Sequence, residues 1–250
     1  MNRLSNFFNS VLNQRKTAVG ILILTALLAV GVSGCKNKNA NSANVDDDPR
    51  AQPPFTSGVA PQPDAQVAVI ECENPAYGKI VMELYPNIAP KMVARFKELI
   101  AKGFYNGVTF HRIDPNLGII QGGDPLSKDA DPANDGSGDS DLPNVPGEFS
   151  DLLYDTGIVG AARKGPGGPN KDGTPMTAKQ AWDTANCQFF ITLKRQIGFD
   201  RQYTIFGKVV QGMNNANIIA GAPVEQGTER PEEKIVIKSV TLEPRSNYVK

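Results

Sequence analysis

The clearest pattern of apolar and polar positions lies between residues 66 and 84. Two runs rich in β-branched residues, 66–73 and 78–84, alternate in part and flank the pair Asn74-Pro75. Short alternating runs on either side of a turn are typical of a β-hairpin. The folded part of the chain is therefore predicted to begin with a hairpin.

The period changes to that of a helix from residue 89 onward. Pro90 suits the first helical turn, and Gly103 is a typical stop signal. The apolar residues that share one helix face are Val93, Phe96, Leu99 and Ile100. This spacing predicts a helix over 89–102, and a second helix is expected over 211–220.

Shorter apolar runs predict the remaining strands. They lie at 108–113, 118–121, 157–163, 188–193, 203–210 and 234–242. The segments 122–147 and 164–185 are rich in glycine and proline, and loops of this length in a compact domain usually carry function. Because strands outnumber helices, the pattern favours an antiparallel barrel or sandwich with two helices.

The first 65 residues do not follow either pattern. Three basic residues precede an apolar run at 18–32, which is shorter than the roughly 20 residues that span a bilayer. A secretory signal peptide at 1–34 is therefore expected, with a short retained membrane anchor as the alternative. Residues 35–65 are rich in Asn, Pro and Asp and read as a flexible tether. The expected folded domain is 66–244, followed by a tail at 245–250.

Composition excludes several classes of function. The chain has 26 basic and 26 acidic residues, so no positive surplus indicates a nucleic-acid partner. His111 is the only histidine, which rules out sites that need two or three histidine ligands. We expect His111 to be a structural histidine with satisfied hydrogen bonds, rather than a catalytic base.

The acidic and glycine-rich loops give no recognisable ligand motif. With Gly136 as the sixth position of a calcium loop, Ala133 would be third and Leu142 twelfth, neither of which is a ligand. A solvated loop is expected, with loose calcium binding as the alternative. The run 165–169 lacks the Lys-Ser/Thr pair of a phosphate loop. We therefore expect no metal and no cofactor.

Two cysteines, Cys72 and Cys187, lie in the predicted domain. In an exported protein they could form a disulfide, but their spacing alone cannot settle the geometry. The spacing gives no metal signature either. The sequence leaves a Cys72–Cys187 bond open.

Three linked stretches carry the strongest chemical signal. They are Phe110-His-Arg-Ile113, Gln121-Gly-Gly-Asp124 and Gln188-Phe-Phe-Ile191. Taken alone, these residues could equally well have a structural role, as a salt bridge, a cap and core packing, or a role in a site. Together with 78–84, 89–91 and 206–208, in this order, they resemble the cyclophilins over residues 67–242. This resemblance implies a closed eight-stranded antiparallel β-barrel capped by two α-helices, and peptidyl-prolyl cis-trans isomerase (rotamase) activity.

The resemblance also implies a set of site residues. Arg112 matches the catalytic arginine, Gln121 the glutamine that hydrogen-bonds the substrate backbone, and Phe190 the floor of the proline pocket. Arg163 replaces a common asparagine, and Tyr203 replaces a common histidine. The other expected pocket residues are Leu117, Ile119, Ala162 and Phe199. Leu117 lies in a loop one residue longer than usual.

Two departures from the family pattern change the expected ligands. Gly198 stands where many members have the tryptophan that contacts cyclosporin, so weak cyclosporin binding is expected. The only tryptophan, Trp182, lies in the long 164–185 loop. We expect this loop at the rim of the substrate groove, where it would alter substrate choice.

The tetrapeptide Val32-Ser-Gly-Cys35 resembles the lipobox of bacterial lipoproteins. It implies cleavage before Cys35, a lipid on the Cys35 sulfur and a net charge of −3 after loss of three basic residues. Several acyl chains would give a durable membrane anchor. The expected location is the extracytoplasmic side of a bacterial membrane, in the periplasm or the thylakoid lumen of a photosynthetic species. A monomer is expected.

The sequence therefore predicts a lipid-anchored isomerase that acts on X-Pro bonds of exported proteins. The alternative is a non-catalytic, membrane-tethered module that binds Pro-containing peptides. A pure binding module need not keep Arg112, Gln121 and Phe190 together, so the enzyme is favoured. A solute-binding lipoprotein is poorly supported because such proteins usually need two lobes and a longer chain.

Overall fold

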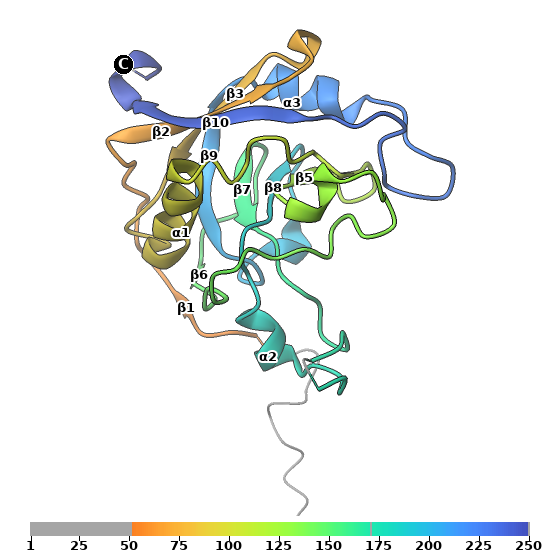
Figure 1. The fold of residues 1–250 in the computed structure, drawn as a ribbon. Helices are drawn as coiled ribbons and strands as arrows, with labels where there is room; N and C mark the ends of the chain where they lie inside the picture. Colours follow the sequence, from red (N-terminus) through yellow and green to blue (C-terminus); the bar gives the residue numbers. More distant parts are fainter. Residues whose placement is uncertain (1–51, 171, 250) are drawn as a thin grey trace, which may run out of the picture. The chain divides into compact units, whose positions relative to one another are not determined.

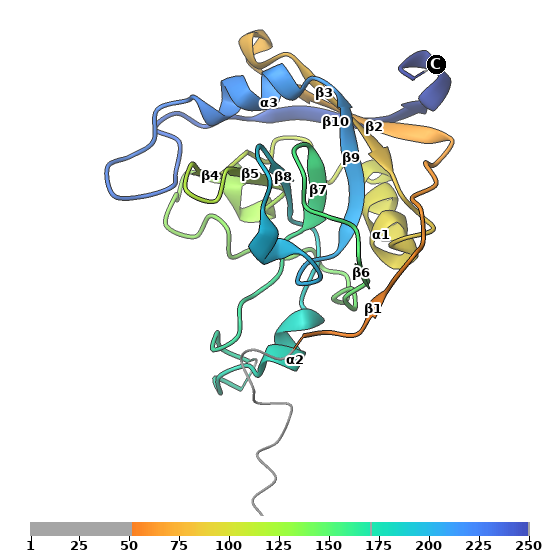
Figure 2. The same cartoon turned by 180° about the vertical axis from the view of Figure 1, so that it is seen from behind.

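A curled antiparallel sheet of eight strands forms the centre of the protein (Figures 1 and 2). The computed structural model describes residues 52–170 and 172–249. The strand order is β10-β2-β3-β9-β7-β8-β5-β4. The strands are β2 (Gln66–Cys72), β3 (Lys79–Leu84), β4 (Arg112–Asp114), β5 (Ile119–Gly122), β7 (Ile158–Ala161), β8 (Phe189–Thr192), β9 (Ile205–Gln211) and β10 (Ile237–Pro244).

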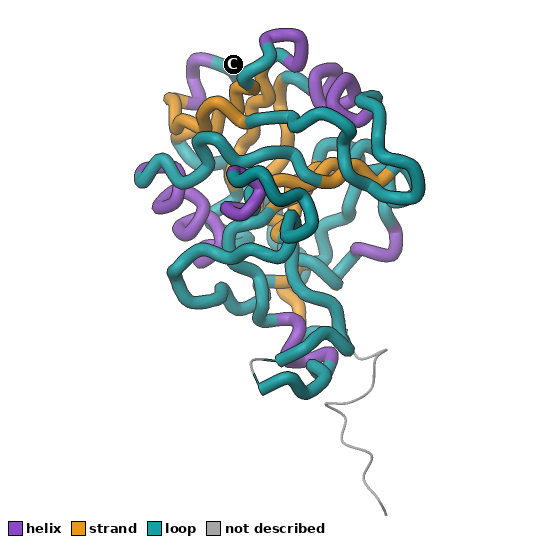
Figure 3. Tube along the Cα trace, turned by 45° about the vertical axis from the view of Figure 1, so that its right-hand side comes forward, coloured by secondary structure: helices purple, strands orange, loops and turns teal. Residues whose placement is uncertain are grey.

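Short helices and long connections surround this sheet (Figure 3). The α-helices are α1 (Pro90–Ala101), α2 (Ala178–Trp182) and α3 (Met213–Ala220). A small parallel sheet pairs β1 (Phe55–Thr56) with β6 (Phe149–Ser150). The 3-10 turns are η2 (Pro75–Tyr77), η3 (Pro125–Lys128), η4 (Ile197–Phe199) and η5 (Arg245–Asn247).

The predicted hairpin and both predicted helices are confirmed. β2 and β3 are antiparallel with Val69 opposite Val81, and η2 forms the turn between them. In α1 the buried residues lie on one face, as the spacing predicted. Figures 1 and 2 show α1 and α3 apart from each other along the curled sheet.

The main core lies on the inner face of the sheet, against α1 and α3. Phe96 of α1 is fully buried there, with its ring centroid 5.6 Å from that of Phe189 and 5.2 Å from that of Phe206. Burial of such a side chain contributes roughly 1.5–3 kcal/mol. The apolar face of α1 therefore holds the helix against β8 and β9.

The barrel is not closed, which corrects the expectation from the resemblance. β10 and β4 are the two ends of the strand order. The predicted strand 108–113 contributes only β4, because Thr109 forms isolated bridges to both Val236 and Asp124 instead of joining one ladder. Between the two ends, Phe110 N donates to Ile235 O and Ile237 N donates to Val108 O. The gap is thus spanned by single backbone hydrogen bonds and not by a continuous pair of strands.

Residues 52–65, which were predicted to belong to the tether, contact the domain. Phe55 pairs with Phe149 across the small sheet, and Gly58 N donates to the Asp151 carboxylate at 2.9 Å. Asp64 forms an ion pair with Lys97 of α1 at 3.0 Å. These contacts hold this part of the chain along the domain. The tail after β10 is also attached, since Arg245 forms an ion pair with the buried Glu83 at 2.5 Å.

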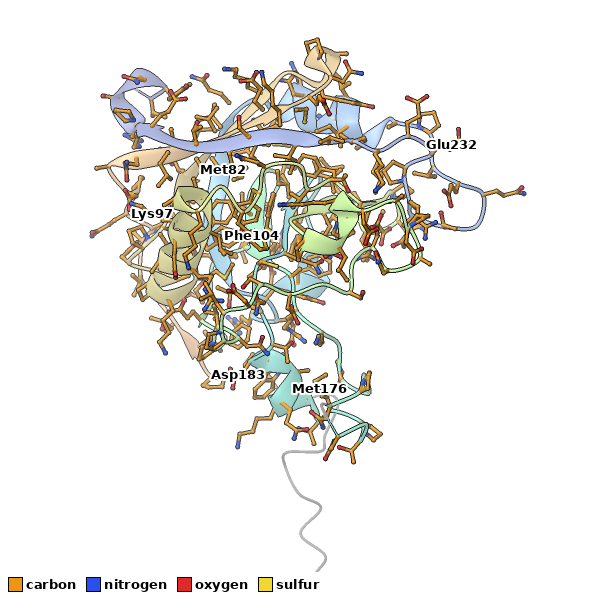
Figure 4. The ribbon with its side chains drawn as sticks, viewed as in Figure 1. Met82, Lys97, Phe104, Met176, Asp183 and Glu232 are labelled. Carbon is orange, nitrogen blue, oxygen red and sulfur yellow. The ribbon has the colours of Figure 1, made fainter. Side chains whose placement is uncertain are left out.

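The loop at 164–185 contains a helix that the sequence analysis did not predict. The Thr177 hydroxyl accepts a hydrogen bond from Gln180 N, and Thr177 N donates in return to Gln180 Oε1, which completes a capping box at the start of α2. Met176 and Asp183, labelled in Figure 4, lie just before and just after α2, which projects away from the sheet. The helix has five residues, too few for the pattern of apolar positions to show it.

Cys72 and Cys187 are both free and buried in the main core. Burial raises the pKa of Cys72 to about 11 and that of Cys187 to about 12. Both thiols therefore stay protonated at neutral pH. The predicted signal peptide at 1–34 and the predicted lipidation site, Cys35, lie outside the described residues, within which no helix is long and apolar enough to cross a membrane.

Candidate active site

One row of directly paired residues crosses four neighbouring strands. Arg112 of β4 pairs with Gln121 of β5, which pairs with Phe190 of β8, which pairs with Gly160 of β7. Residues directly opposite each other in a sheet project from the same face. The sheet register therefore brings an arginine, an amide and an aromatic ring side by side.

This row borders a pocket of about 150 Å³, here called the aromatic pocket. Its lining consists of Arg112, Leu117, Ile119, Gln121, Ala162, Arg163, Phe190, Phe199 and Tyr203. The structure thus brings together the whole set of domain residues that the resemblance implied. The pocket is small beside typical small-molecule sites of roughly 300–1,000 Å³.

Phe190 forms the floor of the aromatic pocket because Gly160 has no side chain. A Cβ at Gly160 would lie 2.4 Å from Phe190 Cζ and 2.6 Å from the Tyr154 hydroxyl. Tyr154 is fully buried and its ring stacks on Phe190, with centroids 5.7 Å apart. The ring of Phe190 is therefore fixed from beneath.

The wall of the aromatic pocket is also aromatic. Phe199, from η4, and Tyr203 both meet the Phe190 ring edge-on, each with centroids 5.5 Å apart. The Arg163 guanidinium lies over the Tyr203 ring at 4.6 Å, and its Nε donates to the Gln202 carbonyl at 3.0 Å. The pocket therefore combines an apolar wall with a fixed cation.

Three side chains hold the Arg112 guanidinium. Its Nη2 donates to Asp114 at 2.7 Å, its Nη1 donates to Gln121 Oε1 at 3.1 Å, and its Nε donates to Glu229. Asp114 is itself buried and accepts a bond from Leu117 N at 2.8 Å. A guanidinium has five N–H groups. These contacts use three, which leaves one hydrogen on each terminal nitrogen for a ligand.

Gln121 belongs to a chain of hydrogen bonds between side-chain amides that leads away from Arg112. Its Nε2 donates to Gln188 Oε1 at 3.0 Å, and Gln188 Nε2 donates to the carbonyls of Gly136 and Gly138. Asp124, fully buried, accepts from the backbone N–H groups of the same two glycines. The loop after β5 is thereby fixed against the sheet.

Steric contacts explain the paired glycines that precede Asp124. A Cβ at Gly122 would lie 2.9 Å from the Thr109 carbonyl oxygen. Gly123 has a φ of 95°, and a Cβ there would lie 2.9 Å from the Cys187 carbonyl oxygen. Only glycine fits this turn without displacing backbone.

A second cavity of about 130 Å³, here called the amide cavity, adjoins the aromatic pocket. Both cavities share Gln121, Ala162 and Arg163. The other residues of the amide cavity are Gly136, Ser137, Asp139, Lys164, Thr184, Asn186 and Gln188. Lys164 and Asp139 form an ion pair at 3.3 Å.

The ends of the long loop therefore reach the groove, whereas its tryptophan does not line it. Lys164 and Thr184 border the amide cavity. Trp182 packs edge-on against Phe149, with ring centroids 6.4 Å apart, and borders none of the described cavities of the site. Any effect of this loop on substrate choice would come from its two ends.

His111 is buried, as predicted, but its hydrogen bonds are not satisfied. It is 7% exposed, and neither ring nitrogen has a hydrogen-bond partner among the described residues. Burial lowers the pKa of His111 to about 4, against the opposing effect of the Asp124 carboxylate. Its ring instead borders a third cavity, of about 490 Å³, here called the histidine cavity.

Several residues that shape the site were not predicted from the sequence. Asp114 lies two residues after Arg112 in β4 and so shares its face, but the predicted strand ended at residue 113. Tyr154 lies in an irregular segment with no local signal, and Glu229 is 117 residues from its partner. Within 52–170 and 172–249, no group of three acidic, histidine or cysteine side chains is placed to hold a metal ion.

Comparison with known proteins places this chain in one family. The model of the cyclophilin type peptidyl-prolyl cis-trans isomerase family matches residues 67–242, and the chain belongs to this family. The protein is therefore a cyclophilin-type peptidyl-prolyl cis-trans isomerase. A Brucella suis protein described as "Probable peptidyl-prolyl cis-trans isomerase" is 36% identical over 173 residues, which cover 67% of this chain and 80% of the relative. A Gallus gallus "Peptidyl-prolyl cis-trans isomerase-like 3" is 32% identical over 169 residues, covering 66% and 90%.

Solved structures show the same relationship. A Cryptosporidium parvum cyclophilin-type isomerase matches with a TM-score of 0.58 and 29% identity, over 71% of this chain and 97% of the other. A second structure of that protein, determined in the presence of the dipeptide Ala-Pro, matches with a TM-score of 0.56 and 26% identity, over 71% and 98%.

Proposed function

We propose that this protein accelerates cis-trans rotation of X-Pro bonds by holding the proline ring in the aromatic pocket and hydrogen-bonding the imide nitrogen through Arg112. The observation that carries this proposal is the row Arg112–Gln121–Phe190 along one pocket edge. The Ala-Pro dipeptide used with a related structure supports a proline ligand.

The chemistry requires no nucleophile and no proton removal. Amide resonance sets a rotation barrier of roughly 18–20 kcal/mol, and it is lost when the bond twists. The imide nitrogen then regains a lone pair that can accept a hydrogen bond. A donor fixed in place favours the twisted state over the planar one.

Arg112 has the geometry for this task. Its side chain is one-third exposed, yet three neighbours orient it and leave two N–H groups free. Gln121 retains a second N–H on its amide for the substrate backbone, because only one is given to Gln188. If Arg112 stabilises the twisted state by about 3–4 kcal/mol more than the planar state, the gain is roughly a hundred- to a thousand-fold.

Exchange NMR of a short Ala-Pro peptide, with and without the full chain, tests this proposal. Accelerated exchange that Arg112→Ala reduces by roughly a hundredfold or more would support it. Peptide binding without acceleration would instead favour the non-catalytic binding module. Unchanged acceleration in Arg112→Ala would contradict the role of the arginine.

We also propose that the protein is a monomeric lipoprotein of the extracytoplasmic membrane surface, acting on exported polypeptides. The support is the Val32-Ser-Gly-Cys35 sequence, followed by a tether. The 16 residues from 36 to 51 can reach at most about 55 Å. Mass spectrometry of the chain from a bacterial host, beside Cys35→Ser, tests this: an acylated N-terminal cysteine supports it, and an intact N-terminus contradicts it.

Weak cyclosporin binding is a further part of the proposal. Gly198, in η4 next to the pocket residue Phe199, provides no ring, and a Cβ at this position would have no neighbour within 4 Å. A nanomolar dissociation constant by calorimetry would contradict this expectation.

A further inference from the structure

The histidine cavity lies next to the aromatic pocket and shares Arg112 and Gln121 with it. It also shares Gly136 and Ser137 with the amide cavity. Its remaining walls are His111 and Asp135 on one side, and Thr228, Glu229 and Arg230 of the loop before β10 on the other. Figure 4 shows this loop beside its label for Glu232.

Unpartnered polar atoms are concentrated around this cavity. Both ring nitrogens of His111 are buried and lack a hydrogen-bond partner among the described residues, and so does Asp135 Oδ1. The same holds for Asn134 Oδ1, from the neighbouring residue. In folded proteins such groups are nearly always paired. Of these three residues, His111 and Asp135 line the cavity, so the acceptor group that an occupant meets there is the Asp135 carboxylate.

One of the two carboxylates that line the cavity has no cation of its own. Its two cations have their own carboxylates, since Arg112 is paired with Glu229 and Asp114, and Arg230 with Glu225 at 3.2 Å. Asp135 has no ion pair among residues 52–170 and 172–249. The nearby ammonium of Lys234 donates to the backbone carbonyls of Ser127 and Asp129 instead. One carboxylate is left for an occupant of the cavity.

We propose that the histidine cavity is a second substrate subsite, which takes a lysine or carboxamide side chain lying within three residues of the proline. This inference rests on the proposed function, because a peptide whose imide nitrogen meets Arg112 passes the mouth of the cavity. Lysine, glutamine and asparagine supply N–H groups to the Asp135 carboxylate. An apolar side chain would leave that carboxylate unpaired, and an acidic one would meet Asp135 and Glu229.

The first test is a peptide series measured with the full chain by exchange NMR. Lys, Gln, Leu or Glu is placed in turn at each position within three residues of an Ala-Pro bond. At one position, kcat/KM is expected to be about fivefold higher for Lys and Gln than for Leu, and lowest for Glu. Asp135→Asn should reduce the lysine preference to less than twofold, whereas Asp141→Asn, at an exposed residue outside the three cavities, should preserve it.

A second readout does not depend on catalysis. His111 is the only histidine, so its ring gives a single assignable NMR signal. Peptides with lysine at the preferred position should shift this signal, whereas matched leucine peptides should not. If exchange is not accelerated but the shift is selective, the subsite stands and the proposed function fails.

Three results would overturn the subsite. The first is equal isomerisation of all peptides, with no effect of Asp135→Asn. The second is a preference for glutamate at every responsive position. The third is a His111 signal that none of the peptides moves.

Discussion

Strands β5 and β8 have two buried faces, of which one packs in the main core and the other borders the aromatic pocket. Ile120, Phe189 and Ile191 point into the main core, while Ile119 and Phe190 point into the cluster around the aromatic pocket. Successive residues of a strand project to opposite faces, so a shift of one residue separates the two sets. The pocket face thus combines apolar residues with the polar side chain of Gln121, whereas the residues of these strands that enter the main core are all apolar.

The largest expected effect is a difference in stability and activity between alanine variants of two neighbouring residues, Phe189 and Phe190. Phe189→Ala leaves a hole among Phe96, Tyr105 and Phe110, and should cost about 3–5 kcal/mol of unfolding free energy. Phe190→Ala opens a space that already borders solvent and should cost less, but should lower kcat/KM roughly a hundredfold. Urea unfolding and exchange NMR of both variants measure this. Equal stability losses, or retained activity in Phe190→Ala, would contradict this difference between the core face and the pocket face.

A second effect concerns His111, beside Arg112. Its pKa is about 4 in the native state, compared with about 6.5 when unfolded. Between these values the unfolded state binds more protons, so stability falls as the pH drops from about 7 to 4, by about 3 kcal/mol. Above pH 7 His111 is neutral in both the native and the unfolded state, so this loss of stability is absent.

Urea unfolding at several pH values measures this loss. His111→Gln should flatten the slope between pH 7 and 5.5, above the ordinary titration range of carboxylates. A wild-type slope that the substitution does not change, or a His111 ring that titrates near 6.5 by NMR, would contradict the assignment.

The floor of the aromatic pocket offers a third test. In Gly160→Ala the new methyl group collides with Phe190 and Tyr154, which pushes the Phe190 ring into the pocket. The expected cost is about 1–3 kcal/mol of stability, together with a several-fold rise in KM. Gly165→Ala, where nothing lies within 4 Å, is the matched control. The explanation fails if both alanines behave alike.

The smallest expected effect comes from replacing Glu229, which orients Arg112 from the loop before β10. Glu229 is 41% exposed, so its ion pair should contribute less than about 1 kcal/mol to stability. Glu229→Gln should nevertheless lower kcat about three- to tenfold at constant KM, because the guanidinium loses one of its three constraints. Glu232→Gln, at an exposed position of the same loop, controls for a general charge effect. A change in KM alone would argue against orientation.

Much of the fold could be predicted because its signals are local. The β2–β3 hairpin, α1 and α3 follow from periodicity and from turn residues such as Asn74-Pro75. The contact between the end strands depends on the split pairing of Thr109, which no local pattern records. The contacts of residues 52–65 were missed because that segment has the composition of a linker.

The candidate site could be predicted in part. Arg112, Ile119, Gln121 and Phe190 lie on neighbouring strands, where register brings them together, and the resemblance supplied the other five pocket residues. The supports of the pocket come from elsewhere. Tyr154 contributes a ring from an irregular segment, and Glu229 is fixed by a backbone bond from Ile113 N to its carbonyl at 2.7 Å. Such contacts exist only once the chain has folded.

The most direct test of the account is exchange NMR of an Ala-Pro peptide with Arg112→Lys beside the wild-type chain. Lysine keeps the positive charge but loses the planar fork that Asp114, Gln121 and Glu229 orient. The account predicts that the peptide still binds while the catalysed exchange rate falls at least about tenfold. A lysine variant as fast as the wild type would contradict it, because charge alone would then suffice.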